Sequence, residues 1–350
     1  MLTALIVVFV FSTVVVIHEL GHFLVCKALG VRVEQFAVGF GKEIVGFMWK
    51  GTRWSFCLLP LGGYVKPAGE EIENTTGAPD EFFGQPWYGR IAIAVAGPIM
   101  NYILAFSCFF LLLFAWGQPA PSNDPVIGEI VAGYPAQASG LIKGDRIVAI
   151  NGTQVNTWQE ASDLIHSNPE KPIDMKIKRN IDQVEVEKIV AIVPKKDQQR
   201  EVGLIGISPD IKMESQNLKE SVKKAGDQTV FWTTLTLKYL ADSIIHRKKP
   251  ELAGPIGIVS IVAKVSKQGL PELISLIALI SLSLGLFNFF PIPLLDGGHI
   301  FLYLLEGILR RPLNKSTVRT ANIIGATLLL SVFLFATTQD LARLKMQFWK

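Results

Sequence analysis

Charge is missing from long parts of this chain. Residues 91–116, 273–295 and 320–339 contain no Asp, Glu, Lys or Arg, and neither do the first 17 residues. Each of these stretches is near or above the ~18 residues that suggest a membrane span. Four buried helices of a large soluble core would each keep a polar face. The absence of charge therefore predicts an integral membrane protein with four spans.

The chain also has few cysteines and no long runs of basic residues, which bears on disulfide-stabilised, secreted and nucleic-acid-binding classes of protein. The three cysteines are Cys26, Cys57 and Cys108, so the segment from 117 to 269 cannot depend on disulfides. No Lys or Arg precedes Lys27, so the basic start of a signal peptide is absent and we expect the first span to be retained. The net charge of +4 is small and no long basic run occurs, which argues against nucleic acid as a partner.

The residues between the spans predict further elements. Alternating apolar residues around the turn at Lys50, Gly51 and Thr52 predict a β-hairpin followed by a loop. A separate soluble module and an amphipathic interfacial helix are expected between the second and third spans. The predicted segments are: span 1–29, hairpin and loop 30–90, span 91–116, module 117–215, interfacial helix region 216–270, span 271–300, loop 301–319, span 320–339 and tail 340–350.

The short loop before the last span predicts the orientation. It carries Arg310, Arg311, Lys315 and Arg319, and short loops rich in Lys and Arg stay in the cytoplasm. With four spans, both termini and the 117–270 segment then lie outside the cytoplasm. The hairpin segment lies inside.

Ionisable residues interrupt the first span at one place, within "FSTVVVIHELGHFLV" (residues 11–25). His18 and His22 are four residues apart, so a helix places both on one face, where they can bind one metal ion. Glu19 lies beside them and can polarise a metal-bound water. Histidine ligands favour zinc over magnesium or calcium. A catalytic zinc site takes three protein ligands, so a third ligand should come from elsewhere in the chain.

The third ligand is predicted from the stretch "NFFPIPLLDGGH" at the end of the third uncharged run. An acid inside a membrane is costly and is a functional candidate by default, which favours Asp296. Pro291 and Pro293 are expected to open the helix before it. A residue at a helix boundary on the cytoplasmic face is the alternative interpretation of Asp296. His299 and Glu306 are rival third ligands.

Three motifs together resemble the site-2 protease family, in its bacterial branch. They are "HELGH" in the first span, a PDZ-like "GLIKGDRIVAING" in the module and "NFFPIPLLDGG" in the third span, and the resemblance covers nearly the whole chain. It implies zinc-dependent intramembrane proteolysis of single-span membrane proteins, often anti-sigma factors. By that pattern His18, His22 and Asp296 bind Zn²⁺, Glu19 is the general base and Asn288 contacts the substrate backbone.

The resemblance also implies the fold class. We expect an α-helical polytopic membrane protein with four transmembrane helices, a membrane-associated β-hairpin and one inserted PDZ-like α+β domain. A free edge of the hairpin would pair with an unwound substrate segment. Gly62, Gly63, Pro291 and Pro293 are predicted as further substrate contacts. Close relatives usually carry two PDZ modules in tandem, whereas this chain has one.

Two other classes of function compete with a protease. A membrane zinc transporter or sensor would also place His and Asp in helices, but it needs neither the adjacent Glu nor a PDZ module. An inactive scaffold would use the PDZ module alone and would not need the complete set of His18, Glu19, His22 and Asp296. The expected location is the bacterial inner membrane, with lipid and a single-span substrate, such as an anti-sigma factor first cut by a site-1 protease, as partners.

Overall fold

The computed structural model describes residues 2–71, 75–181, 184–197, 201–246 and 254–348. Four of its helices are long and apolar enough to cross a membrane. They are α1 (Leu2–Ala28), α2 (Trp87–Ala115), α7 (Leu270–Asn288) and α9 (Lys315–Phe348). The four predicted spans are thus confirmed as helices of sufficient length and hydropathy.

The chain forms two compact units. The first contains residues 1–115 and 217–350 and is mainly helical, and the second contains residues 116–216 and is rich in β-strands. The sequence predicts a separate module over residues 117–215 of this part of the chain. The three cysteines, Cys26, Cys57 and Cys108, are free.

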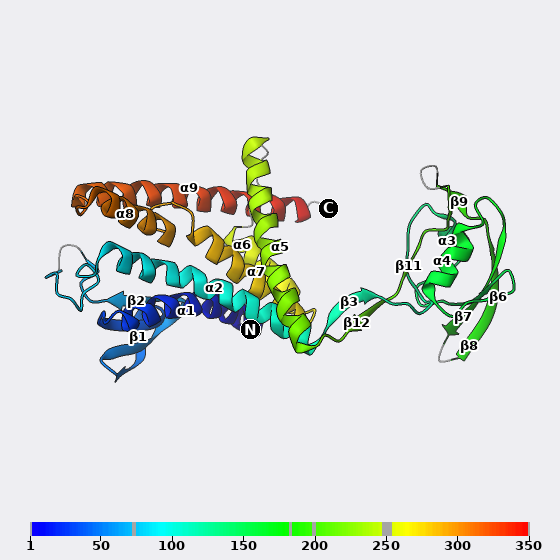
Figure 1. Cartoon of the computed structure of the whole chain (residues 1–350), viewed down its shortest axis with the longest axis horizontal. Helices are drawn as coiled ribbons and strands as arrows, with labels where there is room; N and C mark the ends of the chain where they lie inside the picture. Colours follow the sequence, from blue (N-terminus) through cyan, green and yellow to red (C-terminus); the bar gives the residue numbers. More distant parts are fainter. Residues whose placement is uncertain (1, 72–74, 182–183, 198–200, 247–253, 349–350) are drawn as a thin grey trace. The chain divides into compact units, whose positions relative to one another are not determined.

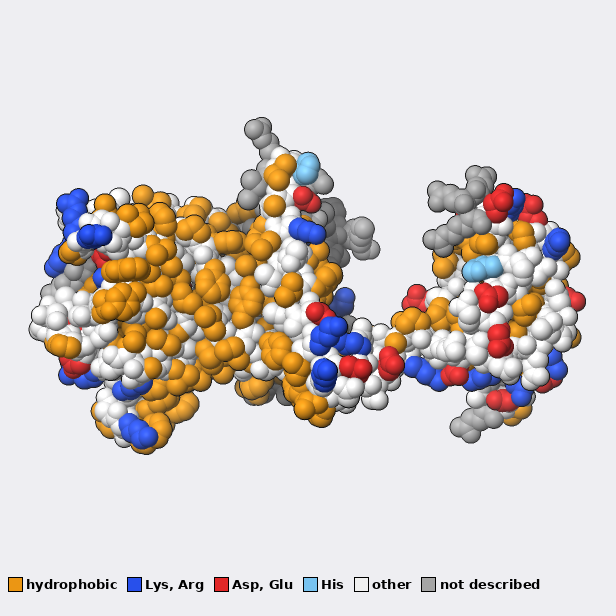
Figure 2. All heavy atoms as spheres, in the orientation of Figure 1, with side chains coloured by type: hydrophobic (Ala, Val, Ile, Leu, Met, Phe, Trp, Pro, Cys, Tyr) orange, Lys and Arg blue, Asp and Glu red, His pale blue; other side chains and the backbone are white. Residues whose placement is uncertain are grey.

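Helix α2 lies at the centre of the helical unit (Figure 1). It packs against α1, α7, α8 (Asp296–Leu309) and α5 (Leu218–Ile245). Small residues allow the closest approach, because a Cβ atom at Gly21 of α1 would lie 2.3 Å from the carbonyl oxygen of Ala96 in α2. A short apolar helix, α6 (Pro255–Val265), packs against α1 through Val262, which joins the buried cluster of Val10 and Val14. Hydrophobic side chains cover much of the visible face of this unit (Figure 2).

The predicted third span is interrupted before Asp296. Helix α7 ends at Asn288, and α8 begins at Asp296 and continues to Leu309, through half of the segment expected as a loop. Pro291 and Pro293 explain the break, since neither offers an N–H to continue a helix. The backbone between the helices is tight: Leu294 has a φ of 78°, a region that bulky residues rarely adopt. Asp296 consequently lies at the first turn of a new helix.

The predicted β-hairpin is present. Strands β1 (Val33–Trp49) and β2 (Thr52–Pro67) pair antiparallel, and the turn falls at Lys50 and Gly51, which have positive φ values of 49° and 73°. Two successive residues with positive φ are typical of the tight turns that match the twist of paired strands. The end of the hairpin exposes a set of large apolar side chains: Ile44, Val45, Phe47, Met48, Trp49, Phe56, Leu58 and Leu59.

The register of the hairpin shifts along its length. Residues 35–38 of β1 pair with residues 63–66 at the end of β2 and also with residues 53–56 at its beginning. Gly39 and Gly41, both with φ near 90°, lie where the pairing changes. This folding back leaves the last residues of β2 beside α1, where Val65 donates its N–H to the Glu19 carboxylate at 3.2 Å.

Glu81 organises the loop between β2 and α2. Its carboxylate accepts hydrogen bonds from the Thr75 hydroxyl, from the N–H and hydroxyl of Thr76 and from the N–H of Gly77, at 2.8–2.9 Å. The Thr75 hydroxyl and the other donors lower the pKa of Glu81 from 4.5 to about 2, because they stabilise the charged form.

Replacing Glu81 by glutamine is expected to loosen residues 75–84 at neutral pH. A carboxyl group whose pKa is lowered on folding stabilises the fold at pH values above its ordinary pKa. For Glu81 that stability is lost as pH falls from about 4.5 to about 2. At pH 7, limited proteolysis should therefore cut the loop of Glu81→Gln faster than that of the wild type. In the wild type, the same increase should occur only in acid. Glu34→Gln is the control, since Glu34 forms one exposed ion pair with Lys66. Equal protease resistance of Glu81→Gln and the control would contradict this role.

The second unit has its own hydrophobic core. A sheet of order β6-β5-β7-β8 forms its largest layer, and two-stranded pairings join β4 to β11, β3 to β12 and β9 to β10. Ile147, Ile150 and Met175 are fully buried in this core, which α3 and α4 help to close. The strands are β3 (Gln118–Pro121), β4 (Ile127–Ile130), β5 (Arg146–Ile150), β6 (Thr153–Gln154), β7 (Ile173–Ile181), β8 (Val184–Ile192), β9 (Lys195–Lys196), β10 (Gly203–Leu204), β11 (Ile207–Pro209) and β12 (Ile211–Glu214), and the helices are α3 (Pro135–Ala138) and α4 (Trp158–His166).

A buried ion pair fixes one corner of this unit. Asp145 has no exposed surface, and Arg179 donates to its two oxygens at 2.7 and 2.8 Å. The N–H of Ile142 also donates to Asp145. Removal of one partner from a buried pair leaves an uncompensated charge.

Arg179→Ala is therefore expected to destabilise the second unit by about 3–5 kcal/mol. The neighbouring Lys178 forms an exposed pair with Glu185 at 3.3 Å, so Lys178→Ala should have little effect. Pulse proteolysis in urea can compare the two variants in the full-length protein. Unfolding of both variants at the same urea concentration would show that the buried pair does not stabilise the unit.

Candidate metal centre

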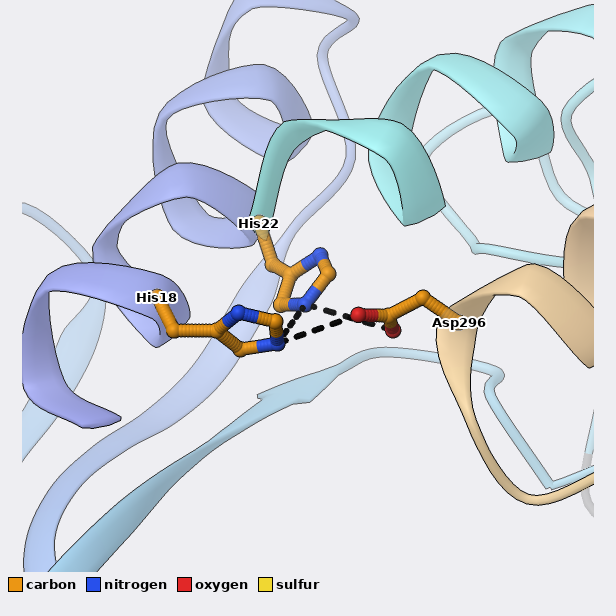
Figure 3. A group of neighbouring side chains, drawn as sticks. All are labelled: His18, His22 and Asp296. Carbon is orange, nitrogen blue, oxygen red and sulfur yellow. Dashed lines mark hydrogen bonds and ion pairs between the residues drawn. The ribbon is translucent and has the colours of Figure 1, made fainter. Parts of the chain in front are cut away.

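The helical unit brings the three predicted ligands together (Figure 3). His18 and His22 project from one face of α1, and Asp296 reaches them from the start of α8. The Nε2 atom of His18 lies 3.2 Å from Nε2 of His22 and 3.1 Å from an oxygen of Asp296. The Nε2 atom of His22 lies 3.5 Å from the other Asp296 oxygen. Among the described residues these three side chains form the group that could hold a metal ion.

The second ring nitrogen of each histidine has its own partner. Nδ1 of His22 donates to the carbonyl oxygen of Ile93 at 2.8 Å, which leaves the lone pair of a neutral ring on Nε2. Nδ1 of His18 lies 3.2 Å from the side-chain amide of Asn101, and the Ser281 hydroxyl donates to the Asn101 backbone oxygen at 2.9 Å. The amide nitrogen of Asn101 faces Nδ1, and its amide oxygen lies 3.4 Å from the Ser281 hydroxyl. These contacts orient both rings toward Asp296.

The spacing of the ligand atoms fits zinc. Zinc takes tetrahedral ligands at about 2.0–2.2 Å from nitrogen and oxygen, which places ligand atoms roughly 3.3–3.5 Å apart. The two histidine nitrogens are 3.2 Å apart, and each lies near that distance from one oxygen of Asp296, His18 at 3.1 Å from Oδ2 and His22 at 3.5 Å from Oδ1. One oxygen of Asp296 is buried and has no hydrogen bond to the described residues. A cation would balance this cluster of electron-rich atoms.

Glu19 stands beside the cluster without belonging to it. Its carboxylate accepts the N–H of Val65, and the side chain lines the same cavity as the two histidines and Asp296. The residue after His18 points to a different side of α1 than the ligand pair does. Glu19 therefore lines the cavity of the metal cluster while it remains outside the ligand group.

The rival ligands His299 and Glu306 line the cavity but are not members of the ligand group. Glu306 pairs with Arg90 of α2 at 2.5 Å, and its other oxygen accepts the N–H of Leu313 at 2.9 Å. Of the three acids and histidines considered from the sequence, the structure brings Asp296 to the histidines.

The cavity around the centre has a volume of about 1160 Å³. Its walls come from α1, the end of β2, α8 and the first turns of α9, and the predicted substrate contact Asn288 lines it. The other four predicted contacts are not among its lining residues. Gly62 and Gly63 instead let β2 pass close to Phe40, Ala37 and α1, and Pro291 and Pro293 shape the break before α8. Their contact with a substrate stays a prediction.

Two residues of "GPIMN" in α2, Gly97 and Asn101, lie directly against the two histidines. Asn101 orients His18. A Cβ atom at Gly97 would lie 2.3 Å from Nε2 of His22 and 2.7 Å from Cε1 of His18. The one signal that could have revealed Asn101 is that it is a polar amide inside an uncharged span.

Known proteins are similar to this chain over most of its length. The sequence profile of peptidase family M50 matches residues 6–332. A protein of Clostridium acetobutylicum is 34% identical over 96% of each chain, and one of Campylobacter jejuni is 35% identical over 96% of this chain and 92% of its own. Both are named as candidate zinc metalloproteases. Metalloprotease MmpA of Caulobacter vibrioides is 30% identical over 96% of this chain and 94% of its own.

One solved structure is similar to part of the chain. The PDZ domain of an SdrC-like protein from Listeria monocytogenes matches 26% of this chain and 90% of its own length, with 24% identity and a TM-score of 0.22. The family assignment rests on the sequence matches, which extend over nearly all of the chain. The chain belongs to peptidase family M50 and is a membrane zinc metalloprotease of the site-2 type.

Proposed function

We propose that this enzyme cleaves the transmembrane segments of single-span membrane proteins. His18, His22 and Asp296 hold the zinc ion, and Glu19 is the general base. The observation that carries the proposal is the convergence of these four side chains on one cavity, between helices long enough to cross a membrane. A hydrolytic site at that depth meets peptide bonds that a soluble protease does not reach.

The roles divide between the metal and the chain. A bound zinc ion lowers the pKa of water and polarises a carbonyl group. Glu19 takes a proton from the attacking water on its carboxylate and returns it to the nitrogen of the departing amine. Ile93 and Asn101 hold the two imidazole rings in place during the reaction.

The position of the end of β2 supports binding of the substrate as an extended strand. A helical substrate hides its peptide bonds, so the segment to be cut must become extended. Tyr64 and Val65 of β2 line the cavity, and the N–H of Val65 points at Glu19. An unwound segment that pairs with this strand would place its backbone beside the general base.

The second unit is proposed to act as a PDZ-like filter outside the cytoplasm. Its compact fold supplies none of the residues of the metal cluster. It would admit single-span proteins whose outer domain has been trimmed, such as an anti-sigma factor cut by a site-1 protease in the bacterial inner membrane. The basic residues Arg310, Arg311, Lys315 and Arg319 support this orientation.

Thiol labelling tests the orientation. Thr153→Cys places a cysteine on an exposed strand of the second unit, whereas Cys26 and Cys57 are buried. A membrane-impermeant reagent should modify Thr153→Cys in intact spheroplasts. Modification only after lysis would reverse the proposed orientation.

Purified protein in proteoliposomes tests the activity. A labelled single-span substrate with an apolar segment of about 20 residues and a central Gly-Pro pair provides a helix that unwinds readily. Cleavage within the apolar segment should occur, stop with a zinc chelator and resume when zinc is restored. Zinc flux across the membrane without cleavage would favour a transporter, and binding of substrate without cleavage would favour a scaffold.

A further inference from the structure

The cavity has a second wall besides the end of β2. Helix α9 forms it, and Lys315, Arg319, Asn322 and Ala326 are among the residues that line it. Their spacing of three or four residues places them on one face of the helix. Other faces of α9 are apolar and exposed, as at Ile324 and Leu328. The polar face of this span is thus the one turned to the cavity.

Asn322 is the neutral amide on that face. Its side-chain oxygen is buried and accepts no hydrogen bond from the described residues. Glu306 lines the same cavity, but both of its side-chain oxygens have hydrogen-bond partners within the chain, unlike the oxygen of Asn322. A buried polar atom without a partner is destabilising, so its retention inside a membrane helix points to a partner supplied from outside the chain.

An extended substrate needs a group of this kind. A strand has two hydrogen-bonding edges, and pairing with β2 satisfies one of them. The other edge would present unpaired N–H and C=O groups to a site shielded from water, which is unfavourable. A side-chain amide can accept from one peptide N–H and donate to one peptide C=O.

We propose that Asn322 binds the main chain of the substrate on the edge that β2 leaves free. The substrate strand then lies between β2 and α9, with the metal ligands and Glu19 between the two walls. Asn322 contacts substrate rather than the metal, and it recognises backbone rather than a particular side chain. This inference rests on the proposed cleavage of extended transmembrane segments.

Substitution of Asn322 tests the inference in full-length protein with the labelled single-span substrate. Asn322→Leu keeps the approximate volume and removes the amide, so kcat/KM should fall about 10-fold or more while zinc content is unchanged. Asn322→Gln should recover part of the loss. Thr327→Val is the matched control, because Thr327 lies on the same helix, does not line the cavity and bonds to the carbonyl of Ile323.

Cross-linking distinguishes contact between Asn322 and the substrate from a purely structural role of Asn322. In the uncut background of Glu19→Gln, Asn322→Cys should form a disulfide with a cysteine near the cleavage site of the substrate, and Ile324→Cys should not. Wild-type kcat/KM in Asn322→Leu, or equal cross-linking from both positions, would overturn the inference alone. Absence of cleavage of any single-span protein by the wild type would overturn the proposed function together with it.

Discussion

Replacement of Glu19 by glutamine is expected to abolish cleavage while the zinc content remains that of the wild type. The substitution keeps the size of the side chain and an oxygen that can accept the N–H of Val65 in β2, but it removes the base. Loss of a general base typically lowers the rate about 10²–10⁴-fold, and more when the same group also protonates the leaving amine. The measurement is product formation in proteoliposomes together with metal analysis of the same sample.

Substitution of the metal ligands provides the control for this result. His18→Ala and Asp296→Ala should lose zinc and activity together, because each removes one of the three converging side chains. Glu19→Gln should lose activity alone. Cleavage by Glu19→Gln at the wild-type rate would show that "HELGH" does not hydrolyse peptide bonds, and transport or sensing would become the better interpretation.

Gly97→Ala is expected to have the second largest effect, although the residue has no chemical function of its own. The added Cβ atom would lie 2.3 Å from Nε2 of His22, so the ring must move away from the position that faces His18 and Asp296. Changes around metal ligands typically cost 10–100-fold in metal affinity, and a displaced ligand should reach at least the upper end of that range. Zinc affinity can be measured by competition with a chelator of known strength.

Gly89→Ala is the matched control for this variant. Gly89 lies in the same helix, and a Cβ atom there would meet only ordinary contacts, at 3.5 Å from Gln85. Alanine is favourable in helices, so both variants should insert and fold. Wild-type zinc affinity in Gly97→Ala would show that the added Cβ atom does not displace the His22 ring, and it would contradict this role of Gly97.

The sequence predicts the spans and the ligands because both have strong local signals. An uncharged run identifies a membrane helix, and the spacing of His18 and His22 fixes their common face. Asp296 could be predicted because an acid within a membrane segment is energetically costly and is therefore a functional candidate. These inferences require no knowledge of how distant segments pack.

Features that depend on packing between distant segments could not be predicted. Asn101 reaches His18 only because α2 lies against α1, and a single amide has no spacing pattern. The hydrogen bond between Val65 and Glu19 depends on the shift of register within the hairpin, which local alternation does not specify. Helix α8 extends into a segment that its basic residues identified as a loop, since charge predicts the side of the membrane and not the backbone conformation.

The break between α7 and α8 joins the metal ligand to the last helix. Pro293 lies three residues before Asp296, and a Cβ atom at Gly325 of α9 would lie within 2.6 Å of its carbonyl carbon, so the two segments are in direct contact. If this contact couples zinc binding to the docking of α9, the coupling is reciprocal. A substrate that displaced α9 on entry would then weaken zinc binding by the same factor by which bound zinc opposes that displacement.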